Sequence, residues 1–170
     1  MPSHITDIFR LLILAVVLVL PAQSLIAQDD TGDSDSPVKV VYHADFADPR
    51  RFSAMLTSIN NMVTYYNNEL LDYDVRIVFV SHGIRFLTDN TLKGTPFTSD
   101  AALEERRENL RGRLATLNNV HGVKLELCDI TRSEIELSMD ALYKGVKTVP
   151  SGVVRIAKLQ SEGFAYIKIE

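Results

Sequence analysis

A chain of 170 residues has the length of one domain, and its hydrophobic fraction of 46% is enough for a sizeable core. The net charge of −4 argues against nucleic acid as the main partner, because binding to phosphates needs a basic surface. The sequence contains one cysteine, Cys128, which therefore cannot form a disulfide within the chain. It is buried and inert, joined to another chain, or a working thiol.

Residues 1–27 have the order of features found in a secretory signal peptide. Arg10 precedes an uninterrupted apolar run from Leu11 to Leu20, and small residues followed by acids come after it. The run is shorter than the roughly 20 apolar residues that a membrane-spanning helix needs. Cleavage is expected after Ser24 or Ala27, preferably Ala27, which predicts a periplasmic or secreted protein with no membrane contact afterwards. An uncleaved signal anchor is the alternative.

The mature chain divides into an acidic leader, residues 28–37, which is expected to be disordered, and a folded domain, residues 38–170. The expected elements in chain order are a strand at 38–45, a helix at 48–71, a strand at 73–83, a loop at 88–100, a helix at 101–119, a strand at 122–128, helical turns at 131–146, a short strand ending at 149, a helix at 151–163 and a strand at 164–169. This alternation predicts an α/β fold: a doubly wound, mostly parallel five-stranded sheet with helices on both faces.

The two long helices have clear start signals and apolar stripes. Asp48 followed by Pro49 supplies an N-cap and a proline at the first helical position, and Ser99 or Asp100 can cap the next helix. Apolar residues recur every three or four positions in both segments, as one buried face requires. The inner stripe expected for the second helix is Leu103, Leu110, Leu114 and Leu117.

Candidate functional residues follow the expected strands. Ligands of open parallel sheets bind beyond the carboxyl ends of the strands. Three polar or reactive groups are expected at that edge: His43 after the first strand, His82 after the second and Cys128 after the third. The residues expected to line the same crevice are Gly83, Asp129, Thr131, Pro150, Ser151 and Gly152.

Two interpretations of Cys128 stay open. The segment after it begins a helix, with Thr131 as a possible cap, and free N–H groups at a helix start favour a thiolate. Asp129 works against this by like-charge repulsion. A free cysteine is also among the most buried residue types, so Cys128 could be a small apolar core residue. His43 and His82 could likewise hold backbone carbonyls or turns.

Several cofactor classes lack support in the sequence. The sequence contains no C-x-x-C or H-x-x-x-H spacing of the kind that predicts a metal site. It also has no glycine-rich dinucleotide-binding motif or P-loop after a strand. We therefore expect neither a metal nor an organic cofactor. A nucleotide-type ligand at the strand ends is a weaker idea that rests on fold analogy alone.

Four segments resemble a known family. They are "VKVVYH", "VFVSHG", "GVKLELC" and "LYKGVKTVPSGVVRIAKLQSEGFAYIKI", which together extend over about residues 38–169. They are similar to the DsrE/DsrF/YchN-like family, and in particular to its exported single-domain members. The resemblance implies a flavodoxin-like three-layer sandwich that assembles as trimers or hexamers.

The resemblance also implies a role in sulfur relay, in which a cysteine accepts sulfane sulfur as a persulfide and passes it on. The matching cysteine is Cys128, and His82 matches the family pattern after the second strand. The first hypothesis is thus a periplasmic persulfide carrier or sulfurtransferase-like protein with a thiol or sulfane-sulfur partner, in which His82 and His43 assist the thiolate. The second is an oligomeric, non-catalytic module that binds a small ligand or a protein, with Cys128 as a packing residue.

Overall fold

The computed structural model describes residues 36–170. The predicted signal peptide, 1–27, and nearly all of the predicted leader, 28–37, lie outside these residues. The strands are β1 (Val38–Ala44), β2 (Tyr73–Phe79), β3 (Lys124–Cys128), β4 (Val146–Val149) and β5 (Ala165–Ile167). They form one sheet in the order β4-β3-β2-β1-β5, and every neighbouring pair is parallel. The predicted fold class is confirmed.

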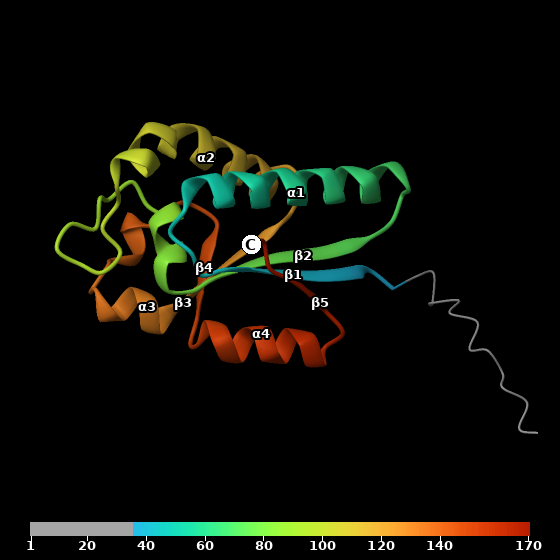
Figure 1. Cartoon of the computed structure of the whole chain (residues 1–170). Helices are drawn as coiled ribbons and strands as arrows, with labels where there is room; N and C mark the ends of the chain where they lie inside the picture. The colour runs from blue at the N-terminus through green and yellow to red at the C-terminus, as the bar shows by residue number, and fades with distance from the viewer. Residues whose placement is uncertain (1–35) are drawn as a thin grey trace, which may run out of the picture. The chain divides into compact units, whose positions relative to one another are not determined.

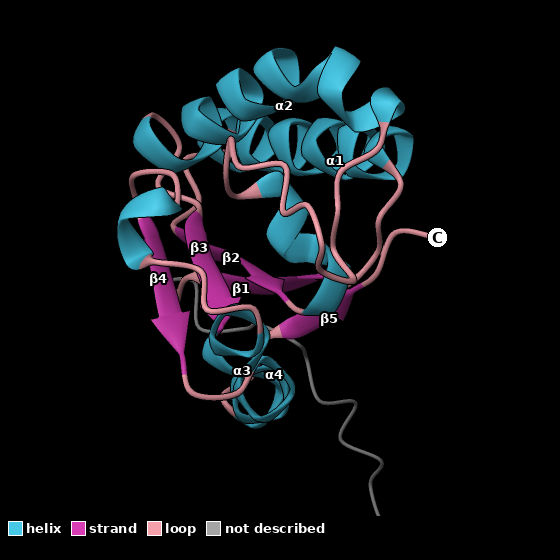
Figure 2. Ribbon diagram, turned by 90° about the vertical axis from the view of Figure 1, so that its left-hand side faces the viewer, coloured by secondary structure: helices cyan, strands magenta, loops and turns pink. Residues whose placement is uncertain are grey.

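Helices cover both faces of this sheet (Figure 1). The long helices α1 (Pro49–Asn68) and α2 (Ala101–Asn119) pack together on one face. Helix α4 (Gly152–Ser161) lies across β1, β2 and β3 on the other. The short helix α3 (Asp129–Glu134) directly follows β3, and Figure 2 shows it at the same end of the sheet as the start of α4.

The helix starts follow from the capping residues. The Asp48 carboxylate accepts a hydrogen bond from the Arg50 N–H at 2.7 Å, with Pro49 at the first helical position of α1. Asp100 caps α2 through the Leu103 N–H at 2.9 Å. The Ser151 hydroxyl accepts from the Val154 N–H at the start of α4. The predicted caps at Asp48 and Asp100 are confirmed.

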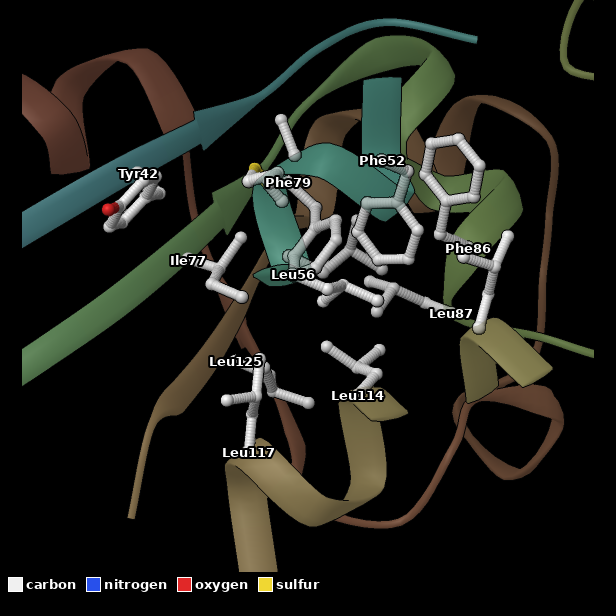
Figure 3. Packing of buried hydrophobic residues seen from close by; sticks show 14 of the residues in the cluster. Tyr42, Phe52, Leu56, Ile77, Phe79, Phe86, Leu87, Leu114, Leu117 and Leu125 are labelled. Atoms are coloured by element: carbon white, nitrogen blue, oxygen red, sulfur yellow. The ribbon is translucent and has the colours of Figure 1, made fainter. Parts of the chain in front are cut away.

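The main core lies between the sheet and helices α1 and α2 (Figure 3). Phe52 of α1 stacks on Phe86 with ring centroids 4.1 Å apart and meets the edge of Phe79 of β2. The predicted stripe of α2 is fully buried, since Leu103, Leu110, Leu114 and Leu117 are each at most 3% exposed. Burial of these side chains supplies most of the driving force for folding.

The core under α4 is smaller and combines apolar contacts with an ion-pair network. Its buried residues are Val41, Val78, Ile156, Leu159 and Phe164. Glu126 of β3, only 7% exposed, accepts hydrogen bonds from Arg155 of α4 at 2.6 and 2.9 Å and from Arg76 of β2 at 2.9 Å. Arg76 also pairs with Asp74 at 2.6 Å. These contacts fix α4 to the sheet through charges rather than through a large apolar interface.

The end of the second strand differs from its prediction. The strand predicted in segment 73–83 was expected to stop at Ser81, His82 and Gly83, but β2 ends at Phe79 and a 3-10 helix, η1 (Ser81–Phe86), follows. The backbone turns at Ser81, whose φ of 52° is in the left-handed region. Gly83 then passes so close to β1 that a Cβ there would lie 2.1 Å from the carbonyl oxygen of Ala44. A second 3-10 helix, η2 (Met139–Ala141), lies in the segment predicted as helical turns. None of the described helices is long and apolar enough to cross a membrane.

Candidate site at the carboxyl edge of the sheet

Cys128 is the last residue of β3, and its side chain is directed to the face of the sheet that α4 covers. Its neighbour Leu127 belongs to the core under α1 and α2, and Glu126, two residues earlier, contacts α4. Side chains alternate along a strand, so Cys128 shares the face of Glu126. The residue is 4% exposed. Burial alone does not decide its chemistry, because hydrogen bonds also act on the thiol.

The hydrogen bonds around Cys128 favour the thiolate. Burial by itself raises the pKa of the thiol, but hydrogen bonding from the backbone of Gly152, Thr131 and Ile130 and from the Thr131 side chain lowers the pKa. Their combined effect holds the pKa of Cys128 below its ordinary value of 9.0. Donors to the charged form of a group stabilise that form. The thiol therefore loses its proton more readily than a solvent-exposed cysteine.

Gly152 allows the start of α4 to approach the sulfur. A Cβ at this position would lie 2.5 Å from Cγ2 of Val80 and 3.0 Å from the Cβ of Cys128, closer than real side chains pack. Only a residue without a side chain brings the Gly152 N–H within reach of the sulfur. Pro150 and Ser151 form the turn that leads from β4 into this helix. Of the predicted crevice-lining residues, Gly152 thus has the most direct contact with Cys128.

Thr131 does not have the predicted capping role. The N-cap of α3 is Cys128, and no side chain caps that helix. Thr131 instead lies within α3, 5% exposed, and its hydroxyl oxygen accepts a hydrogen bond from the Ser81 N–H at 3.0 Å. The prediction was wrong because strand β3 continues directly into α3 and leaves no residue between them. Asp129, expected to repel a thiolate, pairs with Arg132 at 2.6 Å.

His82 lies on η1, next to Gly83. It is not among the residues whose hydrogen bonds act on the thiol of Cys128. Its ring meets the edge of Phe97 with centroids 5.4 Å apart, and its Nδ1 atom is buried without a hydrogen-bond partner in the described part of the chain. Phe97 comes from the loop 88–100, so this loop lies against η1. The N–H of Ser81, one residue before His82, donates to the hydroxyl of Thr131 in α3, the helix that follows Cys128.

His43 occupies a separate part of the same edge. It faces the α4 side of β1, and β2 lies between β1 and β3, so about 10 Å separates the backbones of these strands. The Tyr166 hydroxyl of β5 lies 3.0 Å from Nδ1 of His43, and Asp45, paired with Lys168 at 3.0 Å, lies 3.9 Å from its Nε2. Burial, opposed by Asp45, lowers the pKa of the imidazole.

Two contacts near this edge of the sheet were not predicted from the sequence. Tyr166 was expected only as part of an alternating final strand, and nothing in its neighbourhood indicated a contact with His43. The pairing of Glu126 with Arg155 was also missed, although a glutamate on the strand face that carries Cys128 was a usable signal for a buried ion pair. Both contacts join residues that are far apart in the sequence.

The surface beside Cys128 is apolar and hollowed. A groove of about 450 Å³ is lined by Val149, Pro150, Ser151, Val154, Arg155 and Lys158. Val154 is 66% exposed, and Val153 and Ile130, at the starts of α4 and α3, are 64% and 60% exposed. The groove could hold a small ligand or a side chain of a partner. Between residues 36 and 170, no three His, Cys, Asp or Glu side chains are grouped so that they could hold a metal ion.

Comparison with known families agrees with this architecture. The model of the DsrE/DsrF-like family matches residues 40–169, almost the whole of the described domain. The chain belongs to the DsrE/DsrF-like family.

Three known proteins show what this DsrE/DsrF-like chain is similar to. An uncharacterized protein of Aquifex aeolicus (strain VF5) is 28% identical over 134 residues, which are 78% of this chain and 56% of that protein, so the chain spans about half the length of this curated relative. The solved structure of MTH1491 from Methanobacterium thermoautotrophicum, a protein of unknown function, has a TM-score of 0.55 and 26% identity, and the match covers 77% of this chain and 98% of that one. The YchN protein of E. coli has a TM-score of 0.50, 18% identity and the same coverage, and it supports the fold alone.

Proposed function

We propose that this protein handles sulfane sulfur through Cys128, as a carrier that accepts a sulfur atom and passes it to another thiol. The observation that carries the proposal is the position of Cys128 at the carboxyl edge of a parallel sheet, where Gly152 at the start of α4 packs against it. Hydrogen bonding from the surrounding backbone, which holds the pKa of the thiol below its ordinary value, supports it. The DsrE/DsrF-like family, which is often linked to sulfur relay, supports it. The thiolate is the nucleophile in such exchange.

The transfer balances without an external oxidant. The Cys128 thiolate attacks the outer sulfur of a donor persulfide, R–S–SH, and a new S–S bond forms while the S–S bond of the donor breaks. The donor leaves as its thiolate, and Cys128 carries a persulfide. In the second step an acceptor thiolate attacks the terminal sulfur, and Cys128 is released as a thiolate. Hydrogen bonding around Cys128 favours its thiolate, which is present both before the first step and after the second.

The partner thiol must come from outside the chain. The sequence has no second cysteine, so the persulfide cannot resolve into an internal disulfide. The apolar surface of Ile130, Val153 and Val154 beside Cys128 would bring such an acceptor to the sulfur. The absence of a second cysteine in the sequence supports a carrier, whose turnover depends on a donor and an acceptor.

Intact mass tests this proposal directly. Purified protein is incubated with inorganic polysulfide, desalted and weighed, with a Cys128→Ser variant beside it. We expect the wild type to gain the mass of one or more sulfur atoms, reversed by a reductant, and the variant to gain none. Equal labelling of both proteins, or no labelling of either, would refute the sulfur-carrier role.

A binding module is the second candidate, favoured by the low exposure of Cys128, 4%, next to a groove of about 450 Å³. In this function the groove holds a small ligand or a partner segment, and the cysteine only packs. A Cys128→Ala variant that keeps the ligand affinity and the oligomeric state of the wild type would support it. A Cys128→Ala variant that loses both its ligand affinity and its oligomeric state would exclude the binding-module function.

We also propose that the protein is exported and self-associates. Export rests on the apolar run Leu11–Leu20 followed by small residues, and self-association, as trimers or hexamers, rests on the family resemblance. Fractionation of cells that express the full chain, together with N-terminal sequencing, tests the first. Light scattering of the mature protein tests the second, and a monomer at micromolar concentration would refute it.

A further inference from the structure

The groove beside Cys128 lies next to the strand that carries the thiol. Its lining residues come from the end of β4, the turn after it and α4. Val149 of β4, one of these residues, is paired in register with Cys128 of β3. Neighbouring strands lie about 4.8 Å apart, and side chains at paired positions point to the same face of the sheet. A molecule in the groove would therefore lie against the residue next to Cys128.

The groove has the size and the lining of a site for a small organic molecule. Its volume is about 450 Å³, and sites for small molecules have about 300–1,000 Å³. Val149, Pro150 and Val154 make part of the lining apolar. Its charged residues in the described part of the chain are two cations, Arg155 and Lys158, and it includes no carboxylate. The matching occupant has an apolar part and a negative charge.

The segment that forms β4 and α4 carries positive charge and no negative charge. Residues 141–161 contain no Asp or Glu, although the whole chain has a net charge of −4. Lys147 of β4 pairs in register with Glu126, whose side chain contacts α4, so Lys147 lies on the same face of the sheet as the groove. The cations of this segment are Lys144, Lys147, Arg155 and Lys158.

The nearby carboxylates do not cancel this positive charge. Glu126 accepts hydrogen bonds from Arg155 at 2.6 and 2.9 Å and from Arg76 at 2.9 Å. Asp74 in turn binds Arg76 at 2.6 Å and Lys124 at 2.7 Å. This network places three cations around two carboxylates, so it keeps an excess of positive charge under the groove.

Arg155 and Lys158 differ in how firmly they are held. Glu126 accepts from two of the five N–H groups of the Arg155 guanidinium, which fixes this charge at the groove. The Lys158 side chain is 66% exposed and comes only within 3.9 Å of Glu162, and exposed contacts of this kind contribute little to stability. Arg155 is thus a preorganised contact for an anion, and Lys158 can exchange Glu162 for a ligand at small cost.

We propose that the groove binds an anionic, low-molecular-weight donor of sulfane sulfur, namely an organic persulfide with a carboxylate, and that Arg155, Lys158 and Lys147 select it. This inference rests on the proposed role of Cys128 as a sulfur-accepting thiol. The S–S bond of the donor breaks as its outer sulfur bonds to Cys128, and the rest of the donor leaves as an anionic thiolate. A thiolate that attacks an anionic donor meets like-charge repulsion, which the nearby cations offset.

The experiment compares the alkylation of Cys128 by iodoacetate, an anion, with its alkylation by iodoacetamide, which is neutral and of similar size. Both reagents react with the same thiolate, so the ratio of their rates reports the electrostatic potential at the sulfur and not its protonation. We expect this ratio to be about threefold to tenfold higher in the folded wild type than in the protein unfolded in urea. Added salt should reduce the difference.

Two lysines are replaced, and Arg155 is kept because it also attaches α4 to the sheet. Lys147→Gln/Lys158→Gln should lower the ratio in the folded protein about threefold to fivefold, and Lys147→Arg/Lys158→Arg should retain it. The matched control is Arg50→Gln/Arg106→Gln, which removes two charges from exposed positions of α1 and α2, the helices on the opposite face. Its ratio should stay within about 1.5-fold of the wild type.

Three results would overturn the inference. They are an equal ratio in the folded and the unfolded wild type, an equal decrease in the control variant, and a folded protein in which Cys128 reacts with neither reagent. Each variant is checked by circular dichroism. If Lys147→Gln/Lys158→Gln does not fold, Lys158→Gln takes its place under the same criteria.

Calorimetry with S-methylglutathione tests whether the anionic occupant is a small molecule. This peptide carries carboxylates and no sulfane sulfur, so it can bind without reaction. We expect it to bind the wild type and to bind Lys147→Gln/Lys158→Gln at least about threefold more weakly. No binding to the wild type would overturn the assignment of a small donor and would point to an acidic protein surface instead.

Neither measurement needs a sulfur donor, so both are separate from the test of the proposed function. A raised ratio in a protein that gains no mass from polysulfide would retain the groove as a site for anions and refute the carrier role. Normal sulfur uptake with equal ratios in the folded and unfolded protein would refute the anionic donor alone.

Discussion

Cys128 and His43 lie at the same edge of one sheet, yet their surroundings are built differently. The pKa of Cys128 is lowered mainly by hydrogen bonding from the backbone at the start of α4 and of α3. The imidazole of His43 instead lies beside two side-chain groups, the Tyr166 hydroxyl and the Asp45 carboxylate, which Lys168 in turn binds. Strand β2 separates the two residues.

Both sites lower a pKa, and the consequences are opposite. Burial raises and hydrogen bonds lower the pKa of the Cys128 thiol, and the net decrease favours the charged thiolate. Burial lowers the pKa of His43, which favours the neutral imidazole. A neutral imidazole two strands away cannot act as the cation that stabilises the thiolate. In the proposed sulfur-handling role, we therefore expect the backbone to contribute more than His43 to stabilising the Cys128 thiolate.

The largest effect is expected where α4 is attached to the sheet beneath Cys128. Glu126→Gln should lower the free energy of unfolding by about 2 to 3 kcal/mol, because Arg76 and Arg155 lose a shared, mostly buried carboxylate. The matched control is Glu162→Gln, which breaks an exposed contact with Lys158 and leaves the Glu126 carboxylate in place, and it should change stability by less than about 0.5 kcal/mol. Urea unfolding measures both.

The difference in stability between the wild type and Glu126→Gln should depend on pH in a defined direction. Burial raises the pKa of Glu126, but hydrogen bonds from Arg155 and Arg76 outweigh it and hold the pKa below the ordinary value of 4.5. A lowered carboxyl pKa stabilises the fold above the ordinary pKa, and this contribution is lost as the pH falls through the lowered value. The stability gap between wild type and Glu126→Gln should therefore close in acid. A gap that is constant with pH would contradict the ion-pair account.

The second prediction concerns the approach of α4 to the sulfur. Gly152→Ala should destabilise the protein by about 2 kcal/mol and slow the alkylation of Cys128, because the added Cβ would push α4 away from Val80 and Cys128. Gly112→Ala is the matched control, since nothing lies within 4 Å of its added Cβ and alanine favours the helix. Unchanged reactivity in a folded Gly152→Ala variant would mean that the α4 backbone does not act on the thiol.

The smallest effect is expected from His43→Gln, which sharpens the contrast between the two regions. Alkylation of Cys128 should stay within about twofold of the wild type, because the residues do not share a contact. A clear drop in reactivity would show that His43 assists the thiolate and would break the comparison.

Stability against pH gives an independent readout for His43. Its pKa in the folded protein is below the ordinary value of 6.5, so the unfolded chain takes up the proton first as the pH falls. The contribution of His43 to wild-type stability is therefore complete above the ordinary pKa and decreases as the pH falls below it. The His43→Gln variant should lose less stability between neutral and mildly acidic pH, as thermal melts would measure. An identical slope in both proteins would contradict the lowered pKa.

The element order and the position of Cys128 could be predicted because both depend on local patterns. Apolar spacing and the caps at Asp48 and Asp100 specify the helices, and alternation places Cys128 at the end of a strand. The roles of Thr131 and Tyr166 could not be predicted, since each depends on a contact with a distant segment, Ser81 or His43. Such contacts depend on how the strands pair within the sheet, which the local sequence does not determine.

The most direct test of the central claim is the alkylation of Cys128 across pH in the folded wild-type protein and in the same protein unfolded in urea. If the backbone of α4 and the residues after β3 stabilise the thiolate, the midpoint of the profile lies at lower pH in the folded protein than in the unfolded chain. If Cys128 reacts only after unfolding, the cysteine is a core residue, and the account of an activated thiol is wrong.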